Sequence, residues 1–152
     1  MRFAPKHAPA VKLVVDTNTL VSGTLWSRPP ARLLNAILAV PGTLCLSTDI
    51  VIKLGNVLAR PKFAGRLTAQ GVTVSDIMLR FQRLSRRVIA AEIAPPPDLR
   101  DPKDLIILAA AVGAKADAIV SGDGDLLVLH SFEGIPIVKV RAMLEKMGLP
   151  AE

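Results

Sequence analysis

Short blocks of apolar residues alternate along the chain with longer stretches in which apolar residues recur at helical spacing. The short blocks, rich in β-branched residues, predict buried strands at 11–16, 43–47, near the start of 117–129, and at 135–140, with a further short strand at 87–93. The helical spacing predicts helices at 31–40, 49–63, from the cap at 75 to about 85, 105–116 and 141–148. Strands that alternate with helices in this way indicate a parallel α/β sheet.

Turn and capping residues set the expected limits of these elements. Residues 23–30 are expected to form a loop in which Pro29 and Pro30 open the first helix, and 94–104 is a proline-rich loop. The predicted caps and breaks are Ser47 or Thr48, Ser75, Pro61, Gly113 and Gly148. The Pro- and Ala-rich residues 1–10 are expected to be a flexible arm, and 11–148 a single domain.

Composition narrows the class of protein. Apolar residues make up 51% of the 152 residues, which excludes a disordered chain, and no uncharged apolar run is long enough to span a membrane. The N-terminus lacks the pattern of a signal peptide. Cys45 is the single cysteine and lies far in sequence from both histidines, which excludes a disulfide scaffold and argues against a Cys/His zinc site. We therefore predict a cytoplasmic protein.

The net charge of +6 and the pI of about 10.0 favour a polyanionic partner, the alternative being a basic protein without one. The chain has no Tyr and one Trp, so an aromatic stacking platform for single strands is not expected. If a nucleic acid binds, phosphate contacts should dominate.

Three groups of acidic residues fall at comparable places in the predicted sheet. Asp16 follows the first strand, Asp101 and Asp104 open the buried helix, and Asp123 and Asp125 follow the strand of 117–129. Strand ends and the starts of the following helices share one edge of a parallel sheet, so these carboxylates should converge there. Converging carboxylates repel unless a cation lies between them, and Mg²⁺ or Mn²⁺ suits such oxygen ligands.

Each group taken alone also has a purely structural interpretation. Asp16 and Asn18 could form an Asx-turn, and the stretch around Asp123 and Asp125 could be an ordinary turn. Asp101 and Asp104, with Pro102 between them, are also typical of a capping box. The occurrence of all three groups in one small basic domain is what favours a metal site.

The order of these motifs resembles the PIN domain family, over about residues 12–144. VVDTNTLVSG (14–23) is similar to the opening Asp-Thr-Asn element, and LSTDIVIKLGNVLARPKF (46–63) resembles the second strand and helix. RDPKDLIILAAAVGAKADAIVSGDGDLL (100–127) resembles the third and fourth acidic elements. The subgroup it resembles comprises toxin components of bacterial toxin–antitoxin pairs, related to the VapC-type toxins.

The resemblance implies a three-layer α/β/α PIN-like fold with a central parallel sheet flanked by helices. It also implies a Mg²⁺- or Mn²⁺-dependent endoribonuclease that hydrolyses RNA phosphodiesters, with a cognate antitoxin as partner and a homodimer as the assembly. By residue, it implies catalytic and metal-ligating roles for Asp16, Asp104 and Asp123, with Asp125 as a further metal ligand. Asn18 and Ser121 are supporting polar residues, and of the last pair Asp123 is the favoured ligand.

One position departs from the family pattern, because Lys53 stands where the second acid belongs. A lysine cannot ligate a metal ion, although it could contact a phosphate. Asp49, one helical turn earlier, could substitute in part, pair with Lys53, or simply complement the helix N-terminus. The alternative hypothesis is therefore a degenerate PIN domain that binds RNA or a protein with little or no nuclease activity. A third hypothesis, a small-molecule phosphohydrolase, lacks supporting phosphate-binding motifs.

Two further features carry open alternatives. Arg80, Arg83, Arg86 and Arg87 could form an RNA-binding stripe near the end of one helix, or a solvated face with favourable helix C-terminal charges. Trp26 could stack on a base, or could pack in the core or in a dimer.

Overall fold

The computed structural model describes residues 11–26 and 28–150, and the predicted arm at 1–10 lies outside the described residues. Four strands form one sheet in the order β1 (Leu13–Val15), β4 (Ala118–Val120), β6 (Ile135–Val138) and β5 (Ser131–Phe132). Two more strands, β2 (Cys45–Leu46) and β3 (Arg86–Arg87), pair in parallel. An isolated parallel bridge between Leu13 and Leu44 joins the two parts.

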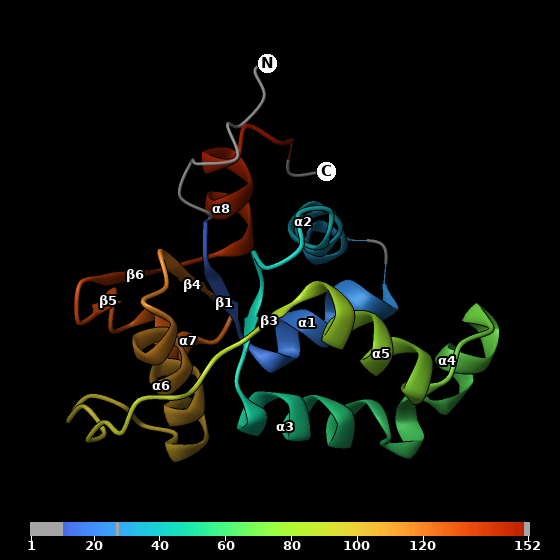
Figure 1. Ribbon diagram of the computed structural model, residues 1–152, viewed down its shortest axis with the longest axis horizontal. Coiled ribbons are helices and arrows are strands. Elements are labelled where there is room, and N and C mark those ends of the chain that lie inside the picture. Colours follow the sequence, from blue (N-terminus) through green and yellow to red (C-terminus); the bar gives the residue numbers. More distant parts are fainter. Residues whose placement is uncertain (1–10, 27, 151–152) are drawn as a thin grey trace.

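Helices cover both faces of this sheet in three layers (Figure 1). They are α1 (Thr17–Leu25), α2 (Pro29–Leu38), α3 (Thr48–Leu58), α4 (Ala64–Gln70), α5 (Val74–Leu84), α6 (Leu105–Ala114), α7 (Gly124–Leu127) and α8 (Val140–Lys146), with short 3₁₀ turns η1 (Pro61–Phe63) and η2 (Pro102–Asp104). In Figure 1, α2 and α8 lie above the strands and α6 lies below them, where it packs on β1, β2 and β4. The predicted three-layer α/β/α fold is confirmed.

The sheet is mostly parallel, because β1, β4 and β6 run the same way and β5 pairs antiparallel with β6. The strands β1 and β4 are buried at every residue, which explains why they appear in the sequence as short continuous apolar blocks. Cys45 in β2 is fully buried in the hydrophobic core that also contains β1 and β4. Its burial raises the pKa of its thiol. None of the described helices is long and apolar enough to cross a membrane.

Several predicted boundaries are confirmed. Pro29 begins α2, Ser47 caps α3 by accepting a hydrogen bond from Ile50 N at 3.2 Å, and Gly148 takes a left-handed conformation after α8. Pro61 is the first residue of η1, and the helix predicted at 49–63 ends before it, at Leu58. This break follows from the missing amide of proline.

Other predictions are wrong. Thr17–Leu25 forms α1, so residues 23–25 are helical, not loop. The sequence does not predict this helix because its β-branched residues and its glycine have weak helix propensity. In the structure, burial against α2 and α3 stabilises it. The cap of α5 is Thr73 and not Ser75, because Thr73 and Asp76 form a reciprocal capping box.

The predicted strand at 87–93 is only β3, at Arg86–Arg87. The chain beyond it crosses α6, and Ala91 N donates to the carbonyl of Ala109 at 3.0 Å. Gly113 lies inside α6, where the Ile89 carbonyl lies so close that a Cβ on Gly113 would be 2.0 Å from its oxygen. The residue that ends α6 is therefore Lys115, in a left-handed conformation, and not Gly113.

Candidate metal centre

The parallel pairing of β1 with β4 fixes the position of Asp16. Val15 lies opposite Val120, so Asp16 and Ser121 both follow the ends of adjacent strands. Asp16 caps α1, and its Oδ1 accepts a hydrogen bond from Thr19 N at 2.7 Å. Its Oδ2 accepts a hydrogen bond from the Ser121 hydroxyl. Asp16 therefore caps a helix where the sequence allowed an Asx-turn. Its carboxylate also accepts a hydrogen bond from Ser121, which follows the neighbouring strand.

Ser121 connects Asp16 to the acidic segment after β4. The Ser121 Oγ accepts a hydrogen bond from Asp123 N at 2.9 Å. Asp123 then caps the short helix α7 by accepting a hydrogen bond from Asp125 N at 2.9 Å. The segment expected to be a plain turn is therefore a capped helical turn whose first residues are fixed by the buried Ser121.

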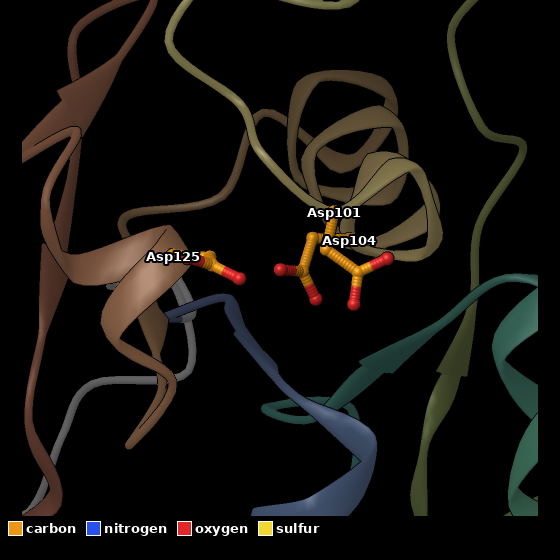
Figure 2. Close-up of side chains that lie close together, drawn as sticks. All are labelled: Asp101, Asp104 and Asp125. Atoms are coloured by element: carbon orange, nitrogen blue, oxygen red, sulfur yellow. The ribbon is translucent and has the colours of Figure 1, made fainter.

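Three carboxylates from two separate segments converge at the start of α6. One carboxylate oxygen from each of Asp101, Asp104 and Asp125 can be chosen so that all lie within 4.8 Å of one another. Figure 2 shows the side chain of Asp125 pointing from α7 toward Asp101 and Asp104. Asp101 caps η2 and Asp104 is its last residue. Asp101 also caps η2 through Lys103 N at 2.9 Å, so the capping interpretation and the convergence both hold for this residue.

Asp104 is the buried member of this group. It is 7% exposed, and no described residue donates a hydrogen bond to its Oδ2. The pKa of Asp104 is raised to about 7, first by burial, then by the adjoining Asp123, which accepts a hydrogen bond from the neutral carboxyl, and by the negative charges of Asp123 and Asp101. The positive charge of Lys53 lowers the same pKa, so Lys53 lies within electrostatic reach of the cluster.

This arrangement fits a divalent cation. A buried carboxylate oxygen without a hydrogen-bond donor normally costs free energy, and a cation would remove that cost. The donor set is made of oxygens alone, which suits Mg²⁺ or Mn²⁺ and not a soft metal. Asp101, Asp104 and Asp125 are the residues that could hold such an ion, with Asp123 adjoining Asp104.

A cleft of about 610 Å³ is lined by two of the predicted acidic residues, Asp16 and Asp123, and not by Asp101, Asp104 or Asp125. Its lining comes from the starts of α1 and α7 together with α2 and α8, and consists of Asp16, Asn18, Thr19, Ser22, Pro30, Gly122, Asp123, Gly124 and Val140. The exposed Asn18 and the half-buried Asp123 therefore face the same space. The cleft provides room for a substrate next to the acidic residues.

The structure does not bring all of the predicted site residues together. Asp49 is exposed in the first turn of α3, and the described residues give it no hydrogen bond or ion pair. Arg80 and Arg83 are exposed on α5, and Arg86 and Arg87 are exposed beyond its end in β3, so the four arginines lie near the end of this helix on two different elements. The helix ends at Leu84, and Arg87 instead reaches the Thr48 hydroxyl at 3.5 Å.

The sequence predicts that Asp101 converges with the other carboxylates but assigns it no ligand role, whereas in the structure it lies beside Asp104 and Asp125 as a third possible ligand. The spacing of three residues between Asp101 and Asp104 carried the signal, because one turn of 3₁₀ helix places residues i and i+3 on the same side. Arg100 adds a cation to the same group, with its Nε 3.9 Å from Asp125 Oδ1.

A family model described as the PIN domain matches residues 12–125. Among solved structures, the chain is similar to the crystal structure of PAE2754 from Pyrobaculum aerophilum, with 17% sequence identity and a TM-score of 0.52. That similarity covers 93% of this chain and 98% of the other, and at this identity it concerns the fold. No protein with a curated description gives a significant match.

Proposed function

Since this chain belongs to the PIN domain family, a nuclease superfamily, we propose that it is an endoribonuclease that depends on Mg²⁺ or Mn²⁺. The observation that carries the proposal is the convergence of Asp101, Asp104 and Asp125 around a buried Asp104 oxygen to which no described residue donates a hydrogen bond. The net charge of +6 supports a polyanionic substrate, because an acidic site in a basic protein attracts both a cation and a nucleic acid.

In this proposal Asp101, Asp104 and Asp125 hold the metal, and Asp123 and Asp16, which line the neighbouring cleft, complete the set. When bound, the ion would make a water nucleophilic and neutralise charge on the scissile phosphate. Thr19 N and the Ser121 hydroxyl orient the Asp16 carboxylate. This side chain would therefore lose little conformational entropy when a metal ion binds. Asn18, which is exposed and lines the cleft, would donate a hydrogen bond to a phosphate oxygen of the substrate.

The test is cleavage of a labelled, mostly single-stranded RNA in Mg²⁺, in Mn²⁺ and in EDTA. Asp16→Asn and Asp104→Asn are expected to lower the rate at least about 100-fold, because each removes a ligand carboxylate while keeping the volume of the side chain. Asn also retains the capping of α1 at position 16. Mn²⁺ titration calorimetry provides the readout that is independent of activity.

Glu145→Gln is the matched control, since Glu145 is exposed on α8 and lies in neither acidic group. It should leave the cleavage rate and the Mn²⁺ affinity unchanged. Equal cleavage by the wild-type protein and by Asp104→Asn, prepared in the same way, would assign the activity to a contaminant and would remove the proposal.

A second candidate function is suggested by Lys53, whose charge acts on Asp104. A cation in place of a ligand acid weakens metal binding, so the domain could bind RNA with little cleavage. Lys53→Glu distinguishes the two functions. A rise in both Mn²⁺ affinity and cleavage supports the degenerate domain, whereas a fall from a high initial rate supports Lys53 as a phosphate contact in an active enzyme.

We extend the proposal to a toxin role in the cytoplasm, with a cognate antitoxin and a homodimeric assembly, on the basis of the motif resemblance. Growth arrest on expression, relieved by co-expression of the neighbouring gene, tests the toxin role. Arrest that persists in Asp104→Asn would separate toxicity from the metal centre and would contradict it.

A further inference from the structure

We propose that Trp26 and Arg28 form a subsite for one nucleobase of a single-stranded RNA, next to the acidic site. Two clefts meet at Ser22, which lines both. The larger one contains Asp16 and Asp123, and the smaller, of about 230 Å³, is lined by Ser22, Trp26 and Arg28. This inference rests on the proposed function only in taking RNA as the ligand.

The position of the subsite follows from the geometry of α1. Asn18, Ser22 and Trp26 are spaced by four residues, so they follow one face of the helix and its C-cap. Eight residues at 1.5 Å each place Trp26 about 12 Å along the axis from Asn18. A short oligonucleotide whose backbone lies in the larger cleft therefore reaches Trp26 with a neighbouring base.

The indole is held in place before any ligand binds. Its ring centroid lies 5.9 Å from that of Phe63, with the two planes 71° apart. The guanidinium carbon of Arg66 lies 5.8 Å from the indole centroid, and Arg66 Nε donates to the Leu25 carbonyl at 2.6 Å. Gln70 Nε2 donates to the same carbonyl at 2.9 Å. The rings of Phe63 and Trp26 and the Arg66 guanidinium thus pack together, and Arg66 and Gln70 hold the backbone next to Trp26, so little side-chain entropy is lost when a base stacks on the indole.

The exposure and charge of the site favour a nucleotide. Trp26 is 37% exposed although it is a large aromatic residue. Three cations lie around it: Arg28 in the lining of the cleft, Arg66 beside the indole, and Lys62, whose Nζ lies 5.1 Å from the Phe63 centroid. A second copy of this chain would place the same cations against themselves, which is unfavourable. A nucleotide offers a π face for the indole and a phosphate for Arg28.

The chain contains too few aromatic residues for a platform of successive stacked bases, so this subsite takes one base. It would therefore act on affinity and on the position of the cut, and not on the chemistry of the acidic centre.

Trp26 is the only tryptophan, so the emission of the protein excited at 295 nm reports on this residue alone. A labelled octauridylate is titrated into the full chain in EDTA, where a metal-dependent nuclease does not cut, and a ribose-phosphate oligomer without bases is titrated in parallel. Stacking predicts that the octauridylate quenches the emission and that the base-free oligomer does not.

The variants Trp26→Leu and Trp26→Phe are then compared by anisotropy of the labelled octauridylate. Trp26→Leu should lower the affinity about 5- to 150-fold, and Trp26→Phe should recover part of that loss because it keeps a π face. Ile89→Ala is the matched control, since Ile89 is an apolar side chain that is 89% exposed on another segment. Circular dichroism confirms the fold of each variant.

Binding of octauridylate without any change in Trp26 emission, together with equal affinity of Trp26→Leu, would overturn the subsite. A protein-concentration-dependent emission shift without RNA, accompanied by a dimer that Trp26→Leu dissociates, would also overturn it and assign this face to a second copy. Absence of metal-dependent cleavage, with quenching intact, would remove the proposed nuclease while the subsite stands.

Discussion

In the protein without a metal ion, the burial of Asp104 opposes the ionisation of its carboxyl group. It is buried beside other carboxylates, and its pKa is raised to about 7 from an ordinary value of 3.8. The folded state therefore binds the proton more tightly than the unfolded state does. The stabilisation that this provides is complete below pH 3.8 and is lost as the pH rises toward 7, so the ionised carboxylate costs stability above that pH.

We predict that Asp104→Asn stabilises the protein in EDTA, and that its advantage over the wild type widens by about 2 kcal/mol between pH 5 and pH 8. Asn imitates the neutral carboxyl and does not ionise. Thermal unfolding at the two pH values measures the effect, with Glu145→Gln as the control that should shift neither midpoint.

Added Mn²⁺ should reverse this order at pH 8, because the wild type gains binding free energy that the variant lacks. If Mn²⁺ stabilises both proteins equally, Asp104 is not a ligand. An advantage of Asp104→Asn that is constant with pH would contradict the raised pKa.

At the scale of elements, α6 depends on a close approach of backbone to backbone. The segment after β3 crosses the helix at Gly113, where the Ile89 carbonyl leaves no room for a side chain. Gly55 in α3 is different, because no atom outside its own helix lies within 4 Å of the position of a Cβ. The two glycines have different physical reasons to be in a helix, although they look alike in the sequence.

We predict that Gly113→Ala destabilises the protein by about 1–3 kcal/mol, since the crossing segment must move. Gly55→Ala, the matched substitution, should stabilise it by about 0.5–1 kcal/mol through helix propensity. Urea unfolding of the two variants measures both values. Similar destabilisation by the two substitutions would show that helix packing, and not the crossing at Ile89, determines the effect.

Over the whole molecule, charge is divided between two regions. Residues 28–87 contain ten Lys and Arg residues and two Asp residues, whereas most of the acidic residues lie elsewhere in the chain. This segment includes α2 to α5, which extend to the right of the sheet in Figure 1, and the acidic cluster lies at the start of α6 on the other side of β1. We therefore expect the basic segment, including α5, to contact the phosphates of a bound RNA.

We predict that the affinity for single-stranded RNA falls steeply with salt, and that Arg80→Gln/Arg83→Gln lowers the slope of log K against log [salt] by up to about 1.4, since each phosphate contact contributes about 0.7. Both residues are exposed on α5. Anisotropy titrations in EDTA at several salt concentrations measure the slope.

Arg141→Gln/Lys146→Gln on α8 is the control with the same change in net charge. An equal loss of slope from both pairs would show that overall charge, and not a surface on α5, attracts the RNA.

The pattern of apolar residues by itself determined the alternation of strands and helices. A buried strand requires apolar residues at every second position or in a continuous run, whereas a helix with one buried face requires them about every 3.6 residues. It also predicted that Asp16, Asp104 and the pair Asp123 and Asp125 share one edge of the sheet, since parallel strands end on the same side. It failed at α1, where tertiary contacts with α2 and α3 override weak helix propensity, and at α5, where Thr73 and not Ser75 makes the cap.

Only the tertiary structure decided which acidic residues cap helices and which ones lie close enough together to share a metal ion. The same Asp16 that follows a strand is a cap held by Ser121, and Asp101 stands with Asp104 and Asp125 because η2 and α7 meet in space. Likewise, the sequence left Trp26 open between a base, the core and a dimer, and its position beside Ser22 and Arg28 follows from where α1 ends against α4. Residues far apart in sequence lie together only after long-range packing, which local patterns do not encode.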